Sequence, residues 1–211
     1  MTVYQNVPVL KARELFFNYP DRPLFTQLSV NLLSGINLVK GGDGRGKSTL
    51  LKLLAGAVPA QSGELTVKGI DSQSQPAQYQ AHVFWTNSRS DAHDQITALA
   101  YFELQRSKFA NFNDAVLSDM TDGLGLNTHL HKQLFMLSTG SKRKVFLAAA
   151  FASQAAVTLL DDPFAALDAV SIEFVLRQLQ AAALNGSRSW VIADYVAPDG
   201  LALVQITDLG D

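Results

Sequence analysis

The sequence predicts an α/β fold in which a mostly parallel sheet is flanked by helices, with an antiparallel β edge and a small helical subdomain. Short apolar segments alternate with segments of helical spacing in residues 138–211, a pattern typical of parallel sheets covered by helices. A glycine-rich loop joins a short apolar segment to a helix within residues 36–55. Residues 96–133 show helical spacing without a strand signal, which indicates the helical subdomain.

The composition indicates one compact, soluble domain. Of the 211 residues, 47% are hydrophobic, which suits a single core. The net charge of −2 provides no basic field for nucleic acid, and the absence of cysteine excludes disulfides and thiolate metal sites. The N-terminus lacks a basic start followed by an apolar run, and the apolar run 145–160 is shorter than the roughly 20 residues that cross a bilayer. We therefore expect neither a signal peptide nor a membrane span.

The first half of the chain predicts strands around one helix. Residues 28–35 alternate loosely between apolar and polar side chains, which is typical of an antiparallel strand that ends in a turn. Residues 36–40 form a short apolar strand that leads into the glycine loop. Leucines recur at helical spacing in residues 47–55. Residues 63–69 predict another strand between glycines, and the polar residues 71–80 predict a loop.

The second half predicts a helical insert followed by alternating helices and strands. Asn113 is a candidate N-cap within the insert. We assign residues 88–137 to a helical subdomain, and residues 1–87 and 138–211 to the core of a single domain that spans 1–211. The elements predicted after the insert are a helix (142–152), a strand (157–161), a helix (170–183), a strand (190–194) and a last strand (203–207).

The pattern Gly41-x4-Gly46-Lys47-Ser48 matches the phosphate-binding P-loop. Glycines let backbone N–H groups converge on an anion, and the following helix points its positive dipole end at the same place. Lys47 is expected to reach the β- and γ-phosphates, and the Ser48 hydroxyl to ligate Mg²⁺. The sequence therefore predicts a P-loop NTPase. The residues expected to bind the nucleotide in this loop are Gly42, Asp43, Gly44, Gly46, Lys47, Ser48 and Thr49.

An apolar strand ends in two acids, Asp161 and Asp162. At the carboxyl edge of a parallel sheet these side chains face the ligand crevice. There Asp161 can hold Mg²⁺ through water, and Asp162 can accept the proton of an attacking water. The alternative is that the Asp-Asp-Pro sequence only forms a turn that caps the next helix. The P-loop favours the interpretation as metal ligand and base.

Four motifs, in order, resemble those of the ATPase subunits of ATP-binding cassette (ABC) transporters, over essentially the full chain. GGDGRGKST resembles Walker A, LSTGSKRKV (137–145) the signature Leu-Ser-Gly-Gly-Gln, VTLLDD Walker B and AALD (165–168) the D-loop. Tyr19 resembles the A-loop residue that stacks on adenine, although a turn tyrosine at the solvent edge is the alternative. The phrase LDDPFAALD and the short chain are most similar to the ATPases of cytochrome c maturation haem exporters.

The resemblance implies an ATPase with a RecA-like core that binds ATP with Mg²⁺ and works as a dimer. Two such subunits close head to tail over two ATP molecules. The signature of one subunit, here Ser138, Thr139 and Gly140, completes the γ-phosphate site of the other. A separate transmembrane permease is the expected partner, which places the chain in the cytoplasm, peripheral to the membrane. The D-loop residues expected at the same interface are Ala166 and Asp168.

Three positions depart from the family pattern. Asp162 replaces a Glu, and the missing methylene sets its carboxylate back by about 1.5 Å. Asp194 stands where the family has a His that contacts the γ-phosphate, and a carboxylate there repels phosphate. Asn87 is the expected equivalent of the Gln that contacts Mg²⁺ and the membrane partner, with Thr86 and Ser88 as alternatives. Our hypothesis is that the chain binds MgATP but hydrolyses it slowly, as a homodimer or as the weaker half of a heterodimer.

Two other functional classes compete with the transporter interpretation. One is a soluble nucleotide-gated module whose closure regulates a partner without transport. The other is a P-loop kinase or GTPase, which the signature, the D-loop and the lack of an Asn-Lys-x-Asp motif disfavour. The basic residues 142–144 are interpreted as a solvated first helical turn rather than as a nucleic-acid patch.

Overall fold

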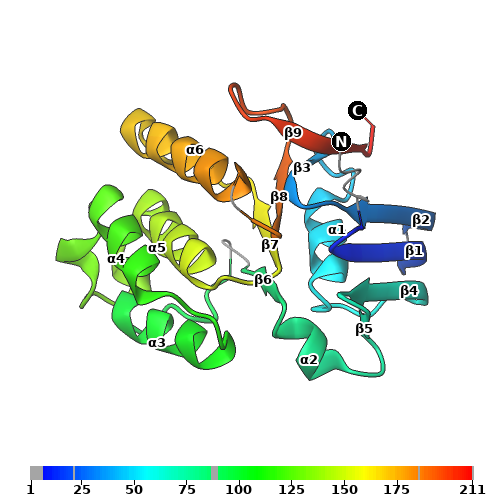
Figure 1. Cartoon of the computed structure of the whole chain (residues 1–211), viewed down its shortest axis with the longest axis horizontal. Coiled ribbons are helices and arrows are strands. Elements are labelled where there is room, and N and C mark those ends of the chain that lie inside the picture. The colour runs from blue at the N-terminus through cyan, green and yellow to red at the C-terminus, as the bar shows by residue number, and fades with distance from the viewer. Residues whose placement is uncertain (1–6, 21, 87–89, 185, 211) are drawn as a thin grey trace, which may run out of the picture.

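The computed structural model describes residues 7–20, 22–86, 90–184 and 186–210. Two sheets and two groups of helices make up the fold (Figure 1). The strands are β1 (Leu10–Tyr19), β2 (Arg22–Leu32), β3 (Gly35–Lys40), β4 (Ser62–Val67), β5 (Ile70–Asp71), β6 (Val83–Trp85), β7 (Val157–Asp161), β8 (Ser189–Asp194) and β9 (Leu203–Asp208). The α-helices are α1 (Lys47–Leu54), α2 (Pro76–Gln80), α3 (Ala98–Lys108), α4 (Asp114–Gly123), α5 (Thr139–Ala152) and α6 (Ala169–Leu184), with 3₁₀ turns at Asn127–His129 and Leu134–Met136.

The central sheet is parallel, in the order β6-β7-β8-β3-β9, which confirms the predicted α/β class. Asp161 pairs with Ala193, and Lys40 pairs with Asp194. The carboxyl ends of β7, β8 and β3 therefore meet at one edge, where the P-loop leaves β3. The second sheet, β2-β1-β4-β5, is antiparallel and forms the predicted antiparallel edge.

Helix α1 lies between the two sheets (Figure 1). Its buried leucines, Leu50, Leu51, Leu53 and Leu54, pack into a cluster with side chains of both sheets, as the helical spacing predicts. Helices α5 and α6 cover the opposite face of the parallel sheet, in a second buried cluster. The packing on both faces fixes the start of α1, and with it the end of the P-loop.

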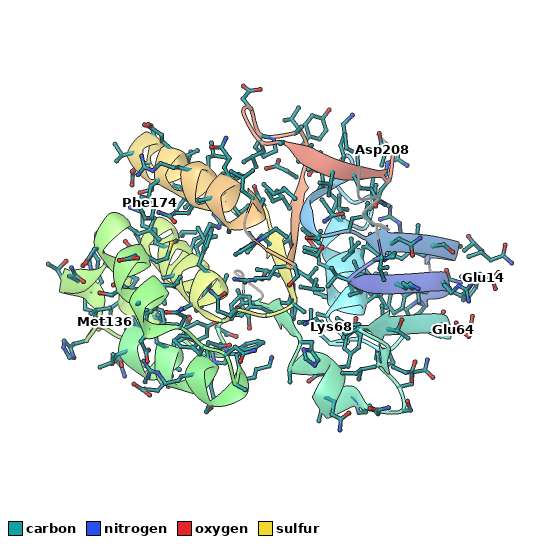
Figure 2. The ribbon with its side chains drawn as sticks, viewed as in Figure 1. Glu14, Glu64, Lys68, Met136, Phe174 and Asp208 are labelled. Carbon is teal, nitrogen blue, oxygen red and sulfur yellow. The ribbon has the colours of Figure 1, made fainter. Side chains whose placement is uncertain are left out.

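The helical insert packs against the core where its helix α4 meets the core helix α5. Phe174 of α6 also reaches α4, where a Cβ atom added at Gly123 would overlap its ring (Figure 2). The buried side chains of α3 and α4 belong to the same cluster as those of α5 and β8. The proposed boundaries of the subdomain at residues 88 and 137 stay a prediction.

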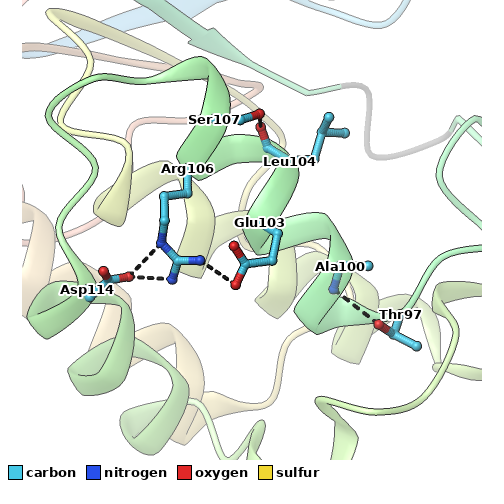
Figure 3. Close-up of polar contacts among 7 residues, drawn as sticks. All are labelled: Thr97, Ala100, Glu103, Leu104, Arg106, Ser107 and Asp114. Atoms are coloured by element: carbon cyan, nitrogen blue, oxygen red, sulfur yellow. Dashed lines mark hydrogen bonds and ion pairs between the residues drawn. The ribbon is translucent and has the colours of Figure 1, made fainter.

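Side-chain caps and an arginine define the ends of the two insert helices (Figure 3). The Thr97 hydroxyl accepts a hydrogen bond from the N–H of Ala100 at the start of α3. Asn113 accepts one from the N–H of Val116, which confirms the predicted N-cap of α4. Arg106 bridges Glu103 and Asp114, and so joins α3 to the first turn of α4.

Two sequence-based element assignments were wrong in part. Residues 71–80, predicted as a loop, contain α2, because Pro76 suits the first helical position and Tyr79 is buried with its hydroxyl donating to the Leu54 carbonyl at 2.6 Å. The helix predicted to start at residue 142 begins at Thr139, because Ser138 caps it with its side chain. Strand β1 has no counterpart among the predicted elements.

Arg188 fastens the C-terminal end of α5 to β8. Its guanidinium lies 4.3 Å from the centroid of the Trp190 ring, and burial lowers its pKa to about 10. Its hydrogen-bond acceptors are the carbonyl oxygens of Ala150, Phe151 and Ala155 and the hydroxyl of Thr158, at 2.8 to 3.3 Å. This single side chain therefore satisfies the last carbonyls of the helix that carries the signature sequence at its other end.

Replacing Arg188 by Ala is expected to lower the free energy of unfolding by about 3 kcal/mol, because it leaves several buried acceptors without donors. Chemical denaturation of the purified variants measures this. The exposed Arg177, whose guanidinium lies over the Phe174 ring, provides the control, and its replacement by Ala should cost about 0.5 kcal/mol. Equal losses for the two variants would contradict the capping role.

Candidate functional site

One open pocket of about 430 Å³ lies where the P-loop meets the carboxyl edge of the parallel sheet. It brings together the P-loop, the two acids after β7, the end of β8 and the tip of the β1–β2 hairpin. Residues far apart in the sequence thus share a single site. The sequence-predicted residues that line it are Tyr19, Gly42, Asp43, Gly44, Gly46, Lys47, Ser48, Thr49, Asp161, Asp162 and Asp194.

The P-loop depends on glycine at two positions in the pocket. Gly44 and Gly46 have φ of 73° and 97°, in the left-handed region that side chains rarely adopt. Gly46 is the N-cap of α1, and a Cβ atom there would lie 3.0 Å from Leu24 and Phe25 of β2. The loop therefore holds the N-terminus of α1, with its free N–H groups, at the floor of the pocket.

Lys47 and Tyr19 both hold the P-loop in this structure. The Lys47 ammonium donates to the carbonyl oxygens of Gly41 and Gly42 at 2.6 and 3.0 Å. The Tyr19 hydroxyl lies 3.1 Å from the Thr49 hydroxyl, and its ring packs edge-on against Phe17. Tyr19 is 43% exposed at the mouth of the pocket, so its ring can accept a planar partner.

Three carboxylates face the P-loop from the sheet edge. Asp161 ends β7, and Asp162 follows with φ of 48° and its N–H bonded to the Ala193 carbonyl at 2.9 Å. Asp194 ends β8 and accepts a hydrogen bond from the N–H of Tyr195 at 2.6 Å. Burial and the nearby Asp162 raise the pKa of Asp194 above its usual value. The sheet edge thus makes the pocket rich in negative charge.

The predicted signature and D-loop residues lie outside this pocket but contact each other. Ser138 caps α5 by accepting from the N–H of Ser141 at 3.1 Å. A Cβ atom added at Gly140 would overlap the carbonyl oxygen of Ala166, a residue with φ of 59°. The signature turn and the D-loop are therefore packed together as one surface, and neither reaches the P-loop of the same chain.

The sequence indicated that the basic residues after the signature form a solvated turn, and this interpretation was wrong. Arg143 is only 8% exposed and donates to the carbonyl oxygen of Ala165. Lys142 is paired with Asp94, and Lys144 with Asp168 at 2.7 Å. These contacts turn the three cations inward, because each finds an acceptor in the D-loop or the insert.

Asp168 is held by two neighbours. Its carboxylate accepts from Lys144, and also from the N–H of Ser171 at 2.8 Å in the first turn of α6. These hydrogen bonds hold the pKa of Asp168 well below its usual range. The predicted D-loop acid therefore joins α5 to α6.

Asn87, the expected third metal ligand, and the alternative Ser88 lie outside the described residues. The other alternative, Thr86, forms a side-chain hydrogen bond with Tyr101, a buried residue of α3. The role itself stays a prediction.

Sequence reasoning missed two residues that line the pocket, Arg22 and Leu24, and did not assign a role to a third, Tyr195. Arg22 starts β2 and pairs with Tyr19 across the hairpin, and its guanidinium donates to the Gly44 carbonyl at 2.8 Å. A hairpin signal around Tyr19 would have brought Arg22 to the site, because paired residues lie side by side.

The sequence matches a known family and curated relatives. A sequence model described as "ABC transporter" matches residues 26–165. The cytochrome c biogenesis ATP-binding export protein CcmA of Legionella pneumophila is 31% identical over 175 residues, which cover 82% of this chain and 86% of the relative. The taurine import ATP-binding protein TauB of Escherichia coli is 30% identical over 169 residues, 76% of this chain and 63% of the relative.

Solved structures share the fold. An ATP-binding subunit of an ABC transporter superposes with a TM-score of 0.81 at 19% identity, covering 89% of this chain and 80% of that one. The CbiO1 protein of Clostridium perfringens, part of the ABC transporter complex CbiONQ, gives a TM-score of 0.67 at 20% identity, covering 90% and 79%. These likenesses confirm the predicted fold class.

Proposed function

Because the chain belongs to the ABC transporter family, we propose that it is an ATP-binding subunit that hydrolyses ATP to drive a separate transmembrane subunit. The observation that carries the proposal is the convergence of Lys47, Asp161 and Asp162 on one pocket at the N-terminus of α1. The relatives named for export and for import match at 31% and 30% identity. The similarity therefore supports the shared ATPase role rather than a particular cargo.

ATP fits the pocket through its phosphates and its base. The N–H groups at the start of α1 and the Lys47 ammonium suit the phosphate chain. On binding, the ammonium exchanges its two carbonyl acceptors for phosphate oxygens. Tyr19 leaves its contact with Thr49 to stack on adenine.

The residues present suit Mg²⁺ bound together with the nucleotide. Ser48 and Asp161 bring a hydroxyl and a carboxylate to the same pocket, and both are hard oxygen donors. Within the described residues, no group of three or more His, Cys, Asp or Glu side chains is placed to hold a metal by itself. This fits an ion that the protein holds through one or two oxygens, with substrate phosphates and water completing its shell. Bound there, Mg²⁺ neutralises charge on the β- and γ-phosphates.

A head-to-tail dimer would complete the site. The signature residues Ser138, Thr139 and Gly140 lie at the N-terminus of α5, outside the P-loop pocket of their own chain. A helix N-terminus favours anions, so a second copy can present these residues to the γ-phosphate. Ala166 and Asp168 of the D-loop would lie at the same interface, because they contact the residues of the signature turn.

The transmembrane partner is a separate chain in this proposal. Within the part of the chain that the structure describes, no helix combines the length and apolarity that crossing a bilayer requires. We place the subunit in the cytoplasm, at the membrane surface through its partner. Thr86, the residue after β6, contacts Tyr101 of α3, so the end of this strand adjoins the helical insert. The family resemblance implies that the partner docks near this segment and the helical insert.

Measurement of ATP binding and steady-state ATP hydrolysis on one purified sample tests the proposal. Lys47→Ala serves as the blank, because it removes the ammonium that would bind the phosphates in this pocket. Binding of ATP that Lys47→Ala abolishes, with turnover above that blank, is the expected result. Binding without turnover above the blank would favour a nucleotide-gated regulatory module. The absence of binding to the parent chain would overturn the ATPase assignment itself.

A further inference from the structure

Arg22 lies over the P-loop as a second cation of the nucleotide pocket. It is the first residue of β2, at the tip of the hairpin that also carries Tyr19. Its Nη2 donates to the Gly44 carbonyl at 2.8 Å, and a Cβ atom added at Gly44 would lie 3.7 Å from Nη1. The guanidinium therefore lies against the turn of the loop that the nucleotide phosphates must approach.

The pocket is lined by more acids than cations, so the positive charge of Arg22 matters for binding an anionic ligand. Among the described residues that line it, Arg22 and Lys47 supply the positive charge. Bound ATP adds about four negative charges, of which Mg²⁺ neutralises two. Lys47 alone leaves the phosphate chain facing an excess of carboxylates. The acids that line the same pocket are Asp43, Asp161, Asp162 and Asp194.

The bond to Gly44 pre-orients the guanidinium without exhausting its donors. Arginine carries five N–H groups, and the Gly44 carbonyl is its one hydrogen-bond acceptor within the described chain. The remaining N–H groups can donate to phosphate oxygens while the first stays in place. Arg22 is otherwise exposed, and this one bond restricts its guanidinium, so less conformational entropy is lost when it binds.

We propose that Arg22 binds the phosphate chain of the nucleotide and sets the affinity of the pocket according to phosphate charge. This inference rests on the proposed binding of ATP. It assigns Arg22 an electrostatic contact with the ligand, beyond its mechanical bond to the P-loop. The strength of that contact should grow with the number of phosphates, because each added phosphate brings negative charge close to the guanidinium.

Dissociation constants for ATP, ADP, AMP and adenosine, measured by titration calorimetry with Mg²⁺ present, test the proposal on two variants. Arg22→Gln keeps an N–H that can reach the Gly44 carbonyl but removes the charge, whereas Arg22→Lys keeps the charge. For Arg22→Gln we expect ATP binding to weaken about 10-fold at low salt, ADP less, AMP least and adenosine not at all. The loss should shrink as salt is added, and Arg22→Lys should retain most of the affinity.

Arg13→Gln is the matched control. Arg13 is an exposed arginine of the same antiparallel sheet, 3.7 Å from Glu64 and outside the pocket, so its loss changes net charge equally. Its nucleotide affinities should equal those of the parent. Equal weakening of ATP and adenosine by Arg22→Gln, or no weakening at all, would overturn the phosphate contact and leave only the bond to Gly44. Failure of the parent to bind ATP is a distinct outcome. It would overturn the proposed function, whatever the role of Arg22.

Discussion

Replacing Asp162 by Glu and Asp194 by His together is expected to raise ATP turnover about 100-fold, because a misplacement of about 1 Å in a reacting group can lower a rate by that factor. The Asp162 carboxylate is one methylene short of the position that a Glu would reach. Its backbone cannot advance to compensate, because the N–H of Asp162 is bonded to the Ala193 carbonyl at 2.9 Å. Its φ of 48° is already in the left-handed region.

Asp194 adds a second obstacle that the same double variant removes. Its carboxylate lines the pocket beside Asp162 and is fixed by the N–H of Tyr195. When ionised, it repels the γ-phosphate and offers no donor to it. A His at this position can donate a hydrogen bond and carries no negative charge. The two substitutions therefore act on different atoms of the same reaction, the attacking water and the phosphate.

Steady-state phosphate release at saturating ATP measures the effect, with both single variants alongside. The matched control is Asp119→Glu with Asp199→His, the same pair of changes at exposed positions away from the pocket. This control should turn over ATP at the rate of the parent. A double variant at positions 162 and 194 that is no faster than the parent would show that these residues do not limit hydrolysis.

The predictable parts of the site are those whose local structure is determined by a short stretch of sequence. Gly44, Gly46 and Lys47 lie within four consecutive residues, so a strand, a loop and a helix in order already place them at a helix N-terminus. Asp161 was predictable because a buried parallel strand delivers its last residue to a known edge of the sheet. Hydrophobic spacing, which is also a local signal, predicted α1 and the alternating helices and strands of residues 138–211.

The parts that were missed depend on contacts between distant segments. Arg22 reaches the pocket only because β1 and β2 form a hairpin over the P-loop, and strand β1 carries register shifts that blur its pattern. Arg143 looked like a surface cation, since nothing in its own turn reveals the Ala165 carbonyl more than 20 residues away. Burial of a charge is decided by such partners, which helical spacing does not encode.

Adding one methyl group at Gly140 should lower ATP hydrolysis without weakening ATP binding. A Cβ atom there would overlap the carbonyl oxygen of Ala166, and neither backbone can yield cheaply. Arg143 and Lys144 tie the D-loop to the same turn, so the loop has little freedom to move away from α5. The variant Gly140→Ala must therefore shift the signature turn against the D-loop by about 1 Å.

We expect Gly140→Ala to lower ATP turnover about 100-fold while leaving ATP affinity of the single chain unchanged. The P-loop pocket contains neither Gly140 nor the D-loop, which is why binding should survive. Hydrolysis requires both elements to meet the second ATP in the proposed dimer. Turnover is best measured in the faster background of Asp162→Glu with Asp194→His, beside calorimetric ATP binding.

Gly123→Ala distinguishes this effect from general damage. It adds the same methyl group at another close contact, where it meets the Phe174 ring between α4 and α6. That contact is apolar and lies outside the signature turn, so Gly123→Ala should reduce thermal stability and leave turnover of the folded protein intact. If instead both variants lose turnover in proportion to their stability, the fit of Gly140 against the D-loop is structural only. If Gly140→Ala alone loses turnover with its stability retained, the signature and the D-loop must act as one unit on the ATP of the other subunit.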